Sequence, residues 1–556
     1  MHTFQELKKA ARAFSAPGLK LALCGDTATQ LLATALRGAL ALRHLGGNLL
    51  ETDYNQVERQ LLAADSELRL SGAEIVIVWE AAERWWQTNE SPEARLERVK
   101  AYATAFPGKL IYLNCAPVAD GVFGSYAATE ESFAVRLRRF NAGLDQLATQ
   151  IPNLHIADLV SIASTLGRQT LFDGALYATA DMVLTPDAQA RLAEHLADII
   201  AALKGKIHKA VILDLDNTLW GGILGEDGME GIQLGEHGVG KAHTNLQRWL
   251  LRLKQRGILL AVCSKNDEAL AKEPFERHPE MLLRLDDIAC FVANWQTKAD
   301  NIAYIQKVLN LGFDSFVFLD DNPAERAIVR QAHPDVCVPD LPEDPACWLD
   351  FLAAENLFET VSYSAEDRAR TAQYRTEAQR VAWKATFKNE AEFLQSLEMV
   401  ASCQSLDAFS IPRAAQLTQR SNQFNLRTRR YTEAELLTLA QDPNTITLAF
   451  TLADRFGDHG LVSVIIGIKQ GSTLFIDTWL MSCRVLKRGL ESFALNHLTQ
   501  AARALGCTQL LGEYIPTPKN GMVATLYPSL GFIPIDATHF TLSLEHFIPK
   551  DTPIHD

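Results

Sequence analysis

The stretch KAVILDLDNTLWGG, residues 209–222, decides the fold of the central part of this chain. Four apolar residues run directly into Asp214 and Asp216, and Thr218 follows two positions later. Side chains at positions i and i+2 of an extended chain point the same way, and two close carboxylates repel each other unless a cation or a shared proton intervenes. Because Mg²⁺ prefers hard oxygen ligands, the pair predicts a magnesium site at the end of a buried strand.

Three further segments of the central region are also apolar runs that end in polar residues, namely GILLAVCSK, IACFVAN and SFVFLDD. Ligands of open α/β sheets bind at the carboxyl ends of the strands, so the residues there are candidates for one site. We expect Asp320 and Asp321 to complete the metal site with Asp214 and Asp216. Ser264 can then hydrogen-bond phosphoryl oxygens, and Lys298, beyond the strand IACFVAN, can neutralise a phosphoryl group.

Composition bounds the class of protein. The chain has 556 residues, of which 47% are hydrophobic and 22% charged, and its net charge is −14 with no basic block. This balance argues against nucleic acid as the main partner. The N-terminus lacks the apolar core of a signal peptide, and no apolar run approaches the ~20 residues of a membrane span. The nine cysteines are scattered, which is typical of reduced thiols, and we expect a cytoplasmic protein.

Strand and helix patterns divide the chain into three predicted α/β domains. Residues 1–205 alternate apolar strands with amphipathic helices, which predicts a parallel sheet covered by helices. Residues 206–365 repeat that pattern. In residues 366–556 three strands joined by the turns GDHG and KQGS form an antiparallel meander, and a long helix, a strand and a short helix follow.

The central domain resembles the haloacid dehalogenase-like (HAD-like) phosphotransferase superfamily. Its four motifs stand here as DLDNT, CSKND, the lysine of WQTKADN, and LDDNPAE. The resemblance implies that Asp214 is the nucleophile, that Asp216 is the general acid/base and that Thr218 orients the nucleophile's loop. It also implies that Ser264 and Lys298 bind phosphate, and that Asp320 ligates Mg²⁺ with support from Asp321.

The gaps between these motifs are short. Asp216 and Ser264 are 48 positions apart (264 − 216), and Ser264 and Lys298 are 34 apart (298 − 264). Each gap must also hold a helix and a strand, so neither leaves room for a large cap domain. We expect the hairpin WGGILGEDG to form a small flap, and the open site to admit a macromolecular substrate.

The stretch SCRVLKRGLESFALNHLTQAARALG places basic residues at a helix N-terminus, where backbone N–H groups and the helix dipole favour anions. With the surrounding strand order, it resembles the GNAT acyltransferase fold, whose loop pattern R/Q-x-x-G-x-G/A holds the pyrophosphate of a pantetheine cofactor. Arg484 and Gly489 fit that pattern, and Lys487 replaces the middle glycine. The resemblance implies that Arg484, Arg488 and Gly489 bind phosphate and that Tyr527 protonates a leaving thiol.

The two domains in this order resemble the FkbH-like proteins over about residues 206–556. The most specific stretches are DLDNTLWGGILGEDG, SNQFNLRTRRYT, LADRFGDHGLVSV and SCRVLKRGLE. The resemblance implies transfer of a glyceryl group from 1,3-bisphosphoglycerate to the phosphopantetheine of an acyl carrier protein, with Mg²⁺-dependent dephosphorylation, in polyketide-type biosynthesis. The alternatives are a Mg²⁺ phosphatase on a sugar or metabolite phosphate with coupled small-molecule acylation, and a non-enzymatic scaffold that recruits carrier proteins.

An enzyme cysteine is expected to hold the acyl group between these steps. A thiolate is favoured beside cations or at a helix N-terminus. Cys483, next to Arg484, is therefore the first candidate, and Cys263, which precedes Ser264, is the second. Each is alternatively a small buried hydrophobe. His459, in the turn GDHG, is a candidate general base or simply an exposed histidine.

The N-terminal domain resembles the SGNH hydrolases through LCGDTAT and ADMVLTPDAQARLAEHL. Thr27 stands in the place of the family's nucleophilic serine, the strand IVIVWEAAE lacks the G-x-N-D continuation, and no histidine precedes LTPD. An esterase needs nucleophile, base and oxyanion donors together. We therefore expect a non-catalytic α/β sandwich that serves as a scaffold or a docking surface.

Overall fold

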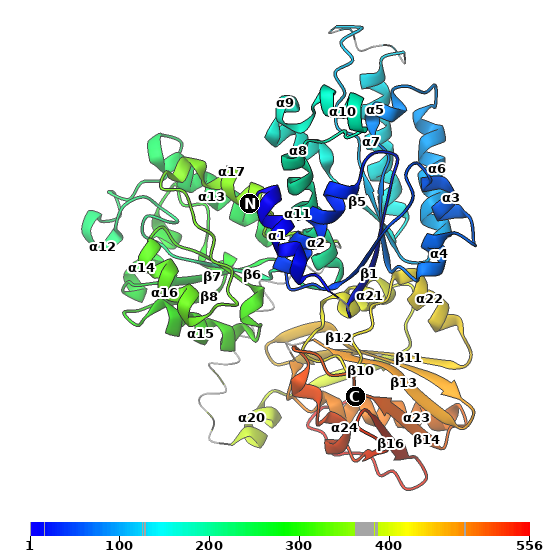
Figure 1. The fold of residues 1–556 in the computed structure, drawn as a ribbon. Helices are drawn as coiled ribbons and strands as arrows, with labels where there is room; N and C mark the ends of the chain where they lie inside the picture. The colour runs from blue at the N-terminus through cyan, green and yellow to red at the C-terminus, as the bar shows by residue number, and fades with distance from the viewer. Residues whose placement is uncertain are drawn as a thin grey trace. The chain divides into compact units, whose positions relative to one another are not determined.

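The computed structural model of the chain describes residues 2–15, 17–124, 126, 129, 131–361, 383, 387, 389–482 and 485–556. These residues divide into two compact units, 1–204 and 205–556 (Figure 1). The boundary between the two units, after residue 204, lies one residue from the predicted boundary after residue 205. The second predicted boundary, between residues 365 and 366, lies outside the described residues, so the three-domain division stays a prediction.

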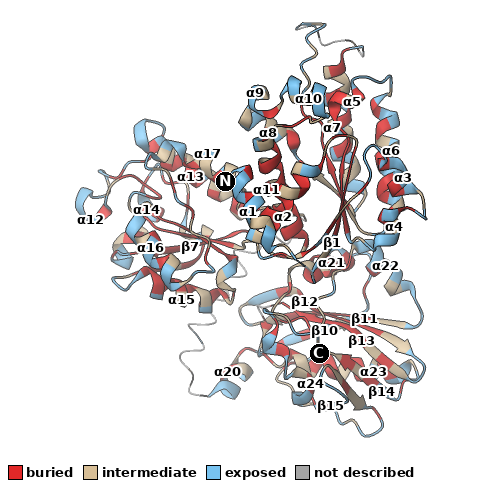
Figure 2. Ribbon diagram, in the orientation of Figure 1, coloured by how far each residue is buried: buried red, intermediate tan, exposed pale blue. Residues whose placement is uncertain are grey.

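The first unit contains a parallel sheet of five strands in the order β2-β1-β3-β4-β5. The strands are β1 (Leu19–Gly25), β2 (Gly47–Glu51), β3 (Ile75–Trp79), β4 (Lys109–Leu113) and β5 (Leu154–Ala157). The middle strand β3, IVIVW, is buried at every position, as expected for a parallel strand covered on both faces (Figure 2). The predicted parallel sheet of the N-terminal region is confirmed.

Helices cover both faces of this sheet. α1 (Phe4–Ala10), α2 (Gln30–Leu42), α8 (Leu159–Leu166), α9 (Arg168–Leu171) and α11 (Pro186–Leu203) pack together on one face, and α3 (Val57–Leu62), α6 (Pro92–Ala105) and α7 (Phe133–Gln150) on the other. Shorter helices complete the unit, namely α4 (Glu67–Ser71), α5 (Ala82–Trp85) and α10 (Gly174–Ala180).

The second unit begins with a parallel sheet of four strands in the order β8-β7-β6-β9. The strands are β6 (Ala210–Leu213), β7 (Leu259–Ser264), β8 (Ile288–Ala293) and β9 (Phe316–Leu319). The helices around them are α12 (Leu224–Asp227), α13 (Gly238–Gln255), α14 (Glu268–Arg277), α15 (Lys298–Leu309), α16 (Pro323–Ala332) and α17 (Trp348–Glu355). Residues 214–293 are all described, and between the strands they hold only α12, α13, α14 and a short 3₁₀ turn, so no large cap is present there.

The remainder of the second unit forms a mixed sheet in the order β10-β11-β12-β13-β14-β16-β15. Its strands are β10 (Val400–Gln404), β11 (Thr445–Asp454), β12 (Gly457–Gln470), β13 (Thr473–Met481), β14 (Gln509–Glu513), β15 (Ile533–Pro534) and β16 (His539–Ser543). β11 to β13 form the predicted antiparallel meander, and β14 then pairs with β13 in parallel. β10, which the sequence analysis did not predict, adds an antiparallel strand beside β11. The helices are α20 (Glu390–Ser396), α21 (Ile411–Arg420), α22 (Glu433–Gln441), α23 (Leu490–Ala504) and α24 (Leu526–Ser529).

The α/β class predicted from the sequence is confirmed by the two parallel sheets and the mixed sheet. Across the described parts of the chain, the structure has no helix that is both long enough and apolar enough to cross a membrane.

Candidate active site

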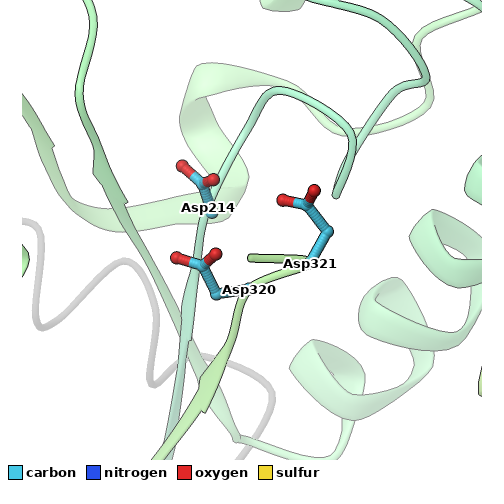
Figure 3. Close-up of side chains that lie close together, drawn as sticks. All are labelled: Asp214, Asp320 and Asp321. Atoms are coloured by element: carbon cyan, nitrogen blue, oxygen red, sulfur yellow. The ribbon is translucent and has the colours of Figure 1, made fainter. Parts of the chain in front are cut away.

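Three carboxylates meet at the carboxyl ends of two neighbouring strands. β6 and β9 pair in parallel with Leu213 opposite Leu319, so the next residues, Asp214 and Asp320, lie side by side. Asp321 follows on the β9 side, and one oxygen of each of the three carboxylates lies within 4.8 Å of the others (Figure 3). This cluster of hard oxygen ligands is the kind of site that a divalent cation such as Mg²⁺ prefers.

Lys298 neutralises two of these carboxylates. Its Nζ lies 2.8 Å from Asp214 Oδ2 and 2.5 Å from Asp320 Oδ2, and all three side chains are buried. Burial disfavours the charged ammonium, but the two carboxylates outweigh that penalty and raise the pKa of Lys298. Lys298 is the first residue of α15, where a cation opposes the helix dipole, so the carboxylates decide its position.

The charged form of the Asp320 carboxyl is disfavoured in this place. Burial raises its pKa to about 6, and the charge of Asp214 adds to that effect. Burial likewise raises the pKa of Asp321, with a further contribution from Asp214. A bound cation would relieve this repulsion, so the three side chains fit a metal ion.

The loop after β6 is fixed to the end of β9 through Thr218. The Asp321 backbone N–H donates to Thr218 Oγ1 at 3.2 Å, and the hydroxyl faces Asp321 Oδ1 at 3.4 Å. Thr218 is fully buried. Thr218 therefore joins the loop that carries Asp214 to the end of β9, and its role in orienting the nucleophile stays a prediction.

Asp216 faces a different set of partners. Its Oδ1 accepts hydrogen bonds from the indole N–H of Trp220 at 2.9 Å and from the Leu224 backbone at 3.0 Å, and its Oδ2 accepts from Asn266 at 3.2 Å. Burial raises the pKa of Asp216. The cluster of three carboxylates does not include Asp216, so the structure gives no support to its side chain as a metal ligand, and that role stays a prediction.

Asn266 and Trp220 were missed as site residues in the sequence. Both lie inside quoted motifs, Asn266 in CSKND and Trp220 in DLDNTLWGG. Trp220 contacts Asp216 from the flap, and Asn266 contacts it from the loop after the neighbouring strand β7. Asn217 adopts a left-handed conformation with φ of 55°, and its side chain accepts a hydrogen bond from Gly222. This turn brings Leu224, the first residue of α12, over Asp216.

Ser264 and Cys263 end strand β7, and both are buried. The Ser264 carbonyl accepts the Asn294 backbone N–H at 3.1 Å, which joins the ends of β7 and β8. Burial raises the pKa of the Cys263 thiol strongly. A buried thiol of raised pKa is a poor nucleophile, so the structure gives no support to Cys263 as an acyl carrier.

In the mixed-sheet part, two predicted site residues, Cys483 and Arg484, lie outside the described residues. Arg488, the predicted phosphate ligand, is buried and points inward, with its guanidinium 3.1 Å from Asp454 Oδ2. The same carboxylate oxygen lies 3.0 Å from His459 Nε2. Arg488, Asp454 and His459 thus form a buried polar cluster. Of the two interpretations of His459, the exposed histidine is wrong, and the general base stays a prediction.

Gly489 is the N-cap of α23 and adopts φ of 85°, a conformation that favours glycine. Lys487, which stands where the acyltransferase pattern has a glycine, also has a left-handed φ of 59°. Burial raises the pKa of the Glu491 carboxyl, in the first turn, and the backbone groups of Lys487 and Gly489 lower it. An internal carboxylate therefore lies at the helix end where phosphate binding was predicted.

Tyr527 lies in the hydrophobic core of the mixed sheet. It is 1% exposed, its ring stacks on Phe540, and its hydroxyl has no hydrogen-bond partner among the described residues. Burial raises its pKa. The structure therefore gives no support to Tyr527 as a proton donor to a leaving thiol, and that role stays a prediction.

In the first unit, Thr27 is buried, and its hydroxyl donates to the Asp181 carbonyl at 2.5 Å. The hydroxyl is thus engaged with the backbone and not with a histidine. This arrangement agrees with the non-catalytic interpretation of the N-terminal domain.

Comparisons with known proteins place this chain in a family. A profile described as "FkbH, N-terminal domain" matches residues 20–201. The N-terminal part of protein BF1531 from Bacteroides fragilis, which contains a phosphatase domain complexed with Mg, is 46% identical in sequence. The match covers 65% of this chain and 100% of that one, with a TM-score of 0.64. This chain belongs to the FkbH-like proteins.

Two acetyltransferase structures resemble the FkbH-like chain more distantly. The ribosomal-protein-S18-alanine N-acetyltransferase from Escherichia coli is 18% identical over 27% of this chain and 99% of that one, with a TM-score of 0.21. The GNAT domain of S. lividans PAT is 12% identical over 26% of this chain and 90% of that one, with a TM-score of 0.22. Among curated proteins, none matches. The FkbH-like chain is an enzyme with a phosphatase-type domain.

Proposed function

We propose that this FkbH-like enzyme transfers a glyceryl group, or a related acyl group, from 1,3-bisphosphoglycerate to an acyl carrier protein, with Mg²⁺-dependent removal of phosphate. The observation that carries the phosphoryl part is the cluster of Asp214, Asp320 and Asp321 with Lys298 between two of its carboxylates. The Mg-bound phosphatase domain of the Bacteroides fragilis relative supports the choice of metal.

Asp214, Asp320 and Asp321 would hold the Mg²⁺ ion. When bound, the ion supplies electrostatic stabilisation to the phosphoryl oxygens. Lys298 would bind the same phosphoryl group as a counter-charge, since its ammonium already lies among the carboxylates. Ser264, at the end of β7, would add a hydrogen bond to a phosphoryl oxygen.

The proposed phosphoryl chemistry proceeds in two steps. The Asp214 carboxylate attacks phosphorus, the bond to the leaving oxygen breaks, and Asp216 gives that oxygen a proton. Asp216 then takes a proton from water, which attacks the aspartyl-phosphate, releases inorganic phosphate and regenerates Asp214. The three hydrogen bonds to Asp216 hold its carboxylate in one orientation for both proton transfers.

In the proposed acyl transfer, an enzyme thiolate attacks the acyl-phosphate carbonyl, and inorganic phosphate leaves as the thioester forms. The phosphatase-type site removes the remaining phosphate. The pantetheine thiol of the carrier protein then attacks the thioester, and the enzyme thiol is released. Cys483 is the proposed enzyme thiol because its neighbour in sequence, Arg484, is cationic.

A second candidate is a Mg²⁺ phosphatase on a sugar or metabolite phosphate with a separate acylation step. Cys263 and Tyr527 are both buried, so neither residue is accessible for the acyl-transfer role predicted for it. Their burial favours this second candidate.

One experiment separates the candidates. The enzyme is incubated with 1,3-bisphosphoglycerate, Mg²⁺ and a pantetheinylated carrier protein, and intact-protein mass spectrometry follows both proteins. A carrier that gains one glyceryl unit supports glyceryl transfer. Phosphate release without any adduct on enzyme or carrier supports the phosphatase instead.

A further inference from the structure

The second unit contains a cavity of about 480 Å³ at the amino ends of the strands of its parallel sheet. Lys209, directly before β6, Leu259, the first residue of β7, and Ser315, directly before β9, belong to its lining. Asp214 and Asp320 follow the opposite ends of β6 and β9. The extended chain from Lys209 to Asp214 spans roughly 16 Å, so this cavity is separate from the phosphatase-type site.

The facing wall comes from the mixed-sheet part of the same unit. Arg413 and Arg420 of α21 (yellow in Figure 1) are seven positions apart, which is two helical turns, so they lie on one face of the helix. The Lys209 ammonium donates to the Arg420 carbonyl at 3.3 Å, and the Asn422 side chain donates to the Gly205 carbonyl at 3.2 Å. These two hydrogen bonds join the walls of the cavity.

Basic side chains outnumber acidic ones in the lining by four to two, although the whole chain has a net charge of −14. The basic residues are Lys209, Arg413, Arg420 and Lys519, and the acidic ones are Asp314 and Asp335. Lys519 pairs with Asp314. Lys209 donates to a carbonyl and Arg413 to the side-chain amide oxygen of Gln416, and neither of these bonds neutralises a charge.

A further cation lies beside this lining. Burial lowers the pKa of Lys206, and the charge of Lys519 lowers it further, whereas Asp314 raises it. Lys206 and Lys519 are therefore close enough to repel each other. Like charges that are held together disfavour their own ionised forms unless an opposite charge joins them. The cluster therefore indicates an anionic ligand.

Neutral polar side chains complete the lining, and they suit an oxyanion. Ser421, Asn422 and Gln423, in the loop after α21, carry hydroxyl and amide donors. A phosphate monoester presents three strong acceptor oxygens and close to two negative charges, which match several cations and donors together. Ser482 also lines the cavity, and it directly precedes the proposed enzyme thiol, Cys483, in the sequence.

We propose that this cavity binds a phosphate monoester, whose oxygens accept hydrogen bonds from the basic side chains of the lining, among them Arg420 and Lys519. Two ligands of the proposed function carry such a group, namely the phosphorylated acyl donor and the phosphopantetheine of a carrier protein. The choice between these two ligands rests on the proposed function, whereas the phosphate site itself rests on the cavity and its charges.

The test is isothermal titration calorimetry of the full-length protein in EDTA. The probes are 3-phosphoglycerate and phosphopantetheine, beside glycerate and pantetheine, which lack the phosphate. Without a metal ion, Asp214, Asp320 and Asp321 repel a phosphate, so the cavity is the stronger site under these conditions. Lys298→Met alters the phosphatase-type site and not the cavity, so it reports on the location of binding.

Three further variants probe the lining. Lys519→Met and Arg420→Met each remove a positive charge, and Asp314→Asn removes the carboxylate that pairs with Lys519. Lys272→Met is the matched control, because Lys272 is also a partly exposed lysine paired with a carboxylate, that of Glu268, and does not belong to the lining.

We expect at least one phosphorylated probe to bind the wild type about tenfold or more tightly than its unphosphorylated counterpart, and the probe that does so identifies the source of the phosphate. Lys519→Met and Arg420→Met should each weaken that binding by about three- to tenfold, and Asp314→Asn should strengthen it. A gain of affinity is not the effect of a merely structural change. Lys272→Met and Lys298→Met should match the wild type.

The proposal is overturned if neither phosphorylated probe binds more tightly than its counterpart. Its placement is overturned if Lys298→Met loses the binding, or if Lys519→Met, Arg420→Met and Asp314→Asn all match the wild type. Because binding is measured without turnover, a failure of glyceryl transfer to a carrier would leave these results unchanged. The two proposals therefore fail separately.

Discussion

The ammonium of Lys298 lies 2.8 Å from the carboxylate of Asp214, although 84 positions separate them in the sequence (298 − 214). The parallel order β8-β7-β6-β9 brings the two residues to one edge of the sheet. Lys298 also contacts Asp320, so one cation balances two buried carboxylates. Removal of Lys298 leaves two carboxylates without their counter-charge in a place from which water is largely excluded.

Lys298→Met should lower the rate of phosphate release by at least about a hundredfold, because it removes the counter-charge of the phosphoryl group. The same change leaves Asp214 and Asp320 unscreened, so the variant without metal should melt earlier than the wild type. Mg²⁺ should then raise its melting temperature by more than it raises that of the wild type. Calorimetric melts with and without Mg²⁺ measure this difference. A smaller Mg²⁺ shift in the variant would contradict the placement of the metal beside Lys298.

Asp214→Asn should abolish phosphate release, with a loss of several orders of magnitude in kcat, because an amide is not a nucleophile at phosphorus. The substitution is nearly isosteric, so circular dichroism should show an unchanged fold. EDTA should stop the wild-type reaction, and excess Mg²⁺ should restore it. Steady-state release of phosphate from para-nitrophenyl phosphate provides the assay. Turnover of Asp214→Asn within tenfold of the wild type would refute the nucleophile assignment.

Much of the phosphatase-type site could be predicted from the sequence, because its residues lie at the ends of strands. Asp214, Ser264 and Asp320 each follow or end an apolar strand, and parallel strands bring their ends to one edge. The partners of Asp216 were not predictable in this way. Trp220 contacts it from the flap that turns at Asn217, and Asn266 contacts it from the loop after β7, so neither contact could be identified from the motifs alone.

The mixed-sheet part shows the limit of motif reasoning more clearly. Arg488 was assigned by its charge beside a helix N-terminus, and Tyr527 by its place in a family pattern, but neither argument gives the direction of a side chain. In the structure, Arg488 pairs with Asp454 inside the domain, and Tyr527 joins the core. Lys487 keeps a left-handed backbone conformation at the position where the loop pattern has a glycine.

Arg488→Met should destabilise the mixed-sheet domain. Loss of one partner of a buried ion pair costs about 3–5 kcal/mol, because the Asp454 carboxylate would lose the charge-assisted bond from Arg488 in a buried place. Denaturant unfolding followed by circular dichroism measures this loss of stability. Lys487→Met is the matched control, since Lys487 is exposed, and its stability should change by ~0.5 kcal/mol or less. Unchanged stability of Arg488→Met, together with weakened carrier binding, would favour a phosphate-binding role instead.

Cys263→Ala should retain both phosphate release and the enzyme's glyceryl adduct. Cys263 belongs to β7, and its thiol is buried in the core. Because burial raises the pKa of the thiol, it behaves as a small apolar group. Cys483→Ala should keep phosphatase activity toward para-nitrophenyl phosphate but lose the adduct formed from 1,3-bisphosphoglycerate without carrier. Mass spectrometry of both variants, with peptide mapping of the adduct, decides the matter. An adduct on Cys263, or one that survives in Cys483→Ala, would refute the assignment to Cys483.

Asn266→Ala should slow both proton transfers assigned to Asp216, because the carboxylate would lose the donor that holds its Oδ2. We expect kcat to fall by about ten- to a hundredfold while KM changes little, because Asn266 contacts the proposed acid, Asp216, and not the phosphoryl group. The loss should be larger for an alkyl phosphate than for para-nitrophenyl phosphate, because the nitrophenolate leaves without protonation. Asn245→Ala, on α13, is the control and should match the wild type with both substrates. An equal loss with both leaving groups would show that Asn266 acts on the fold of the site and not through Asp216.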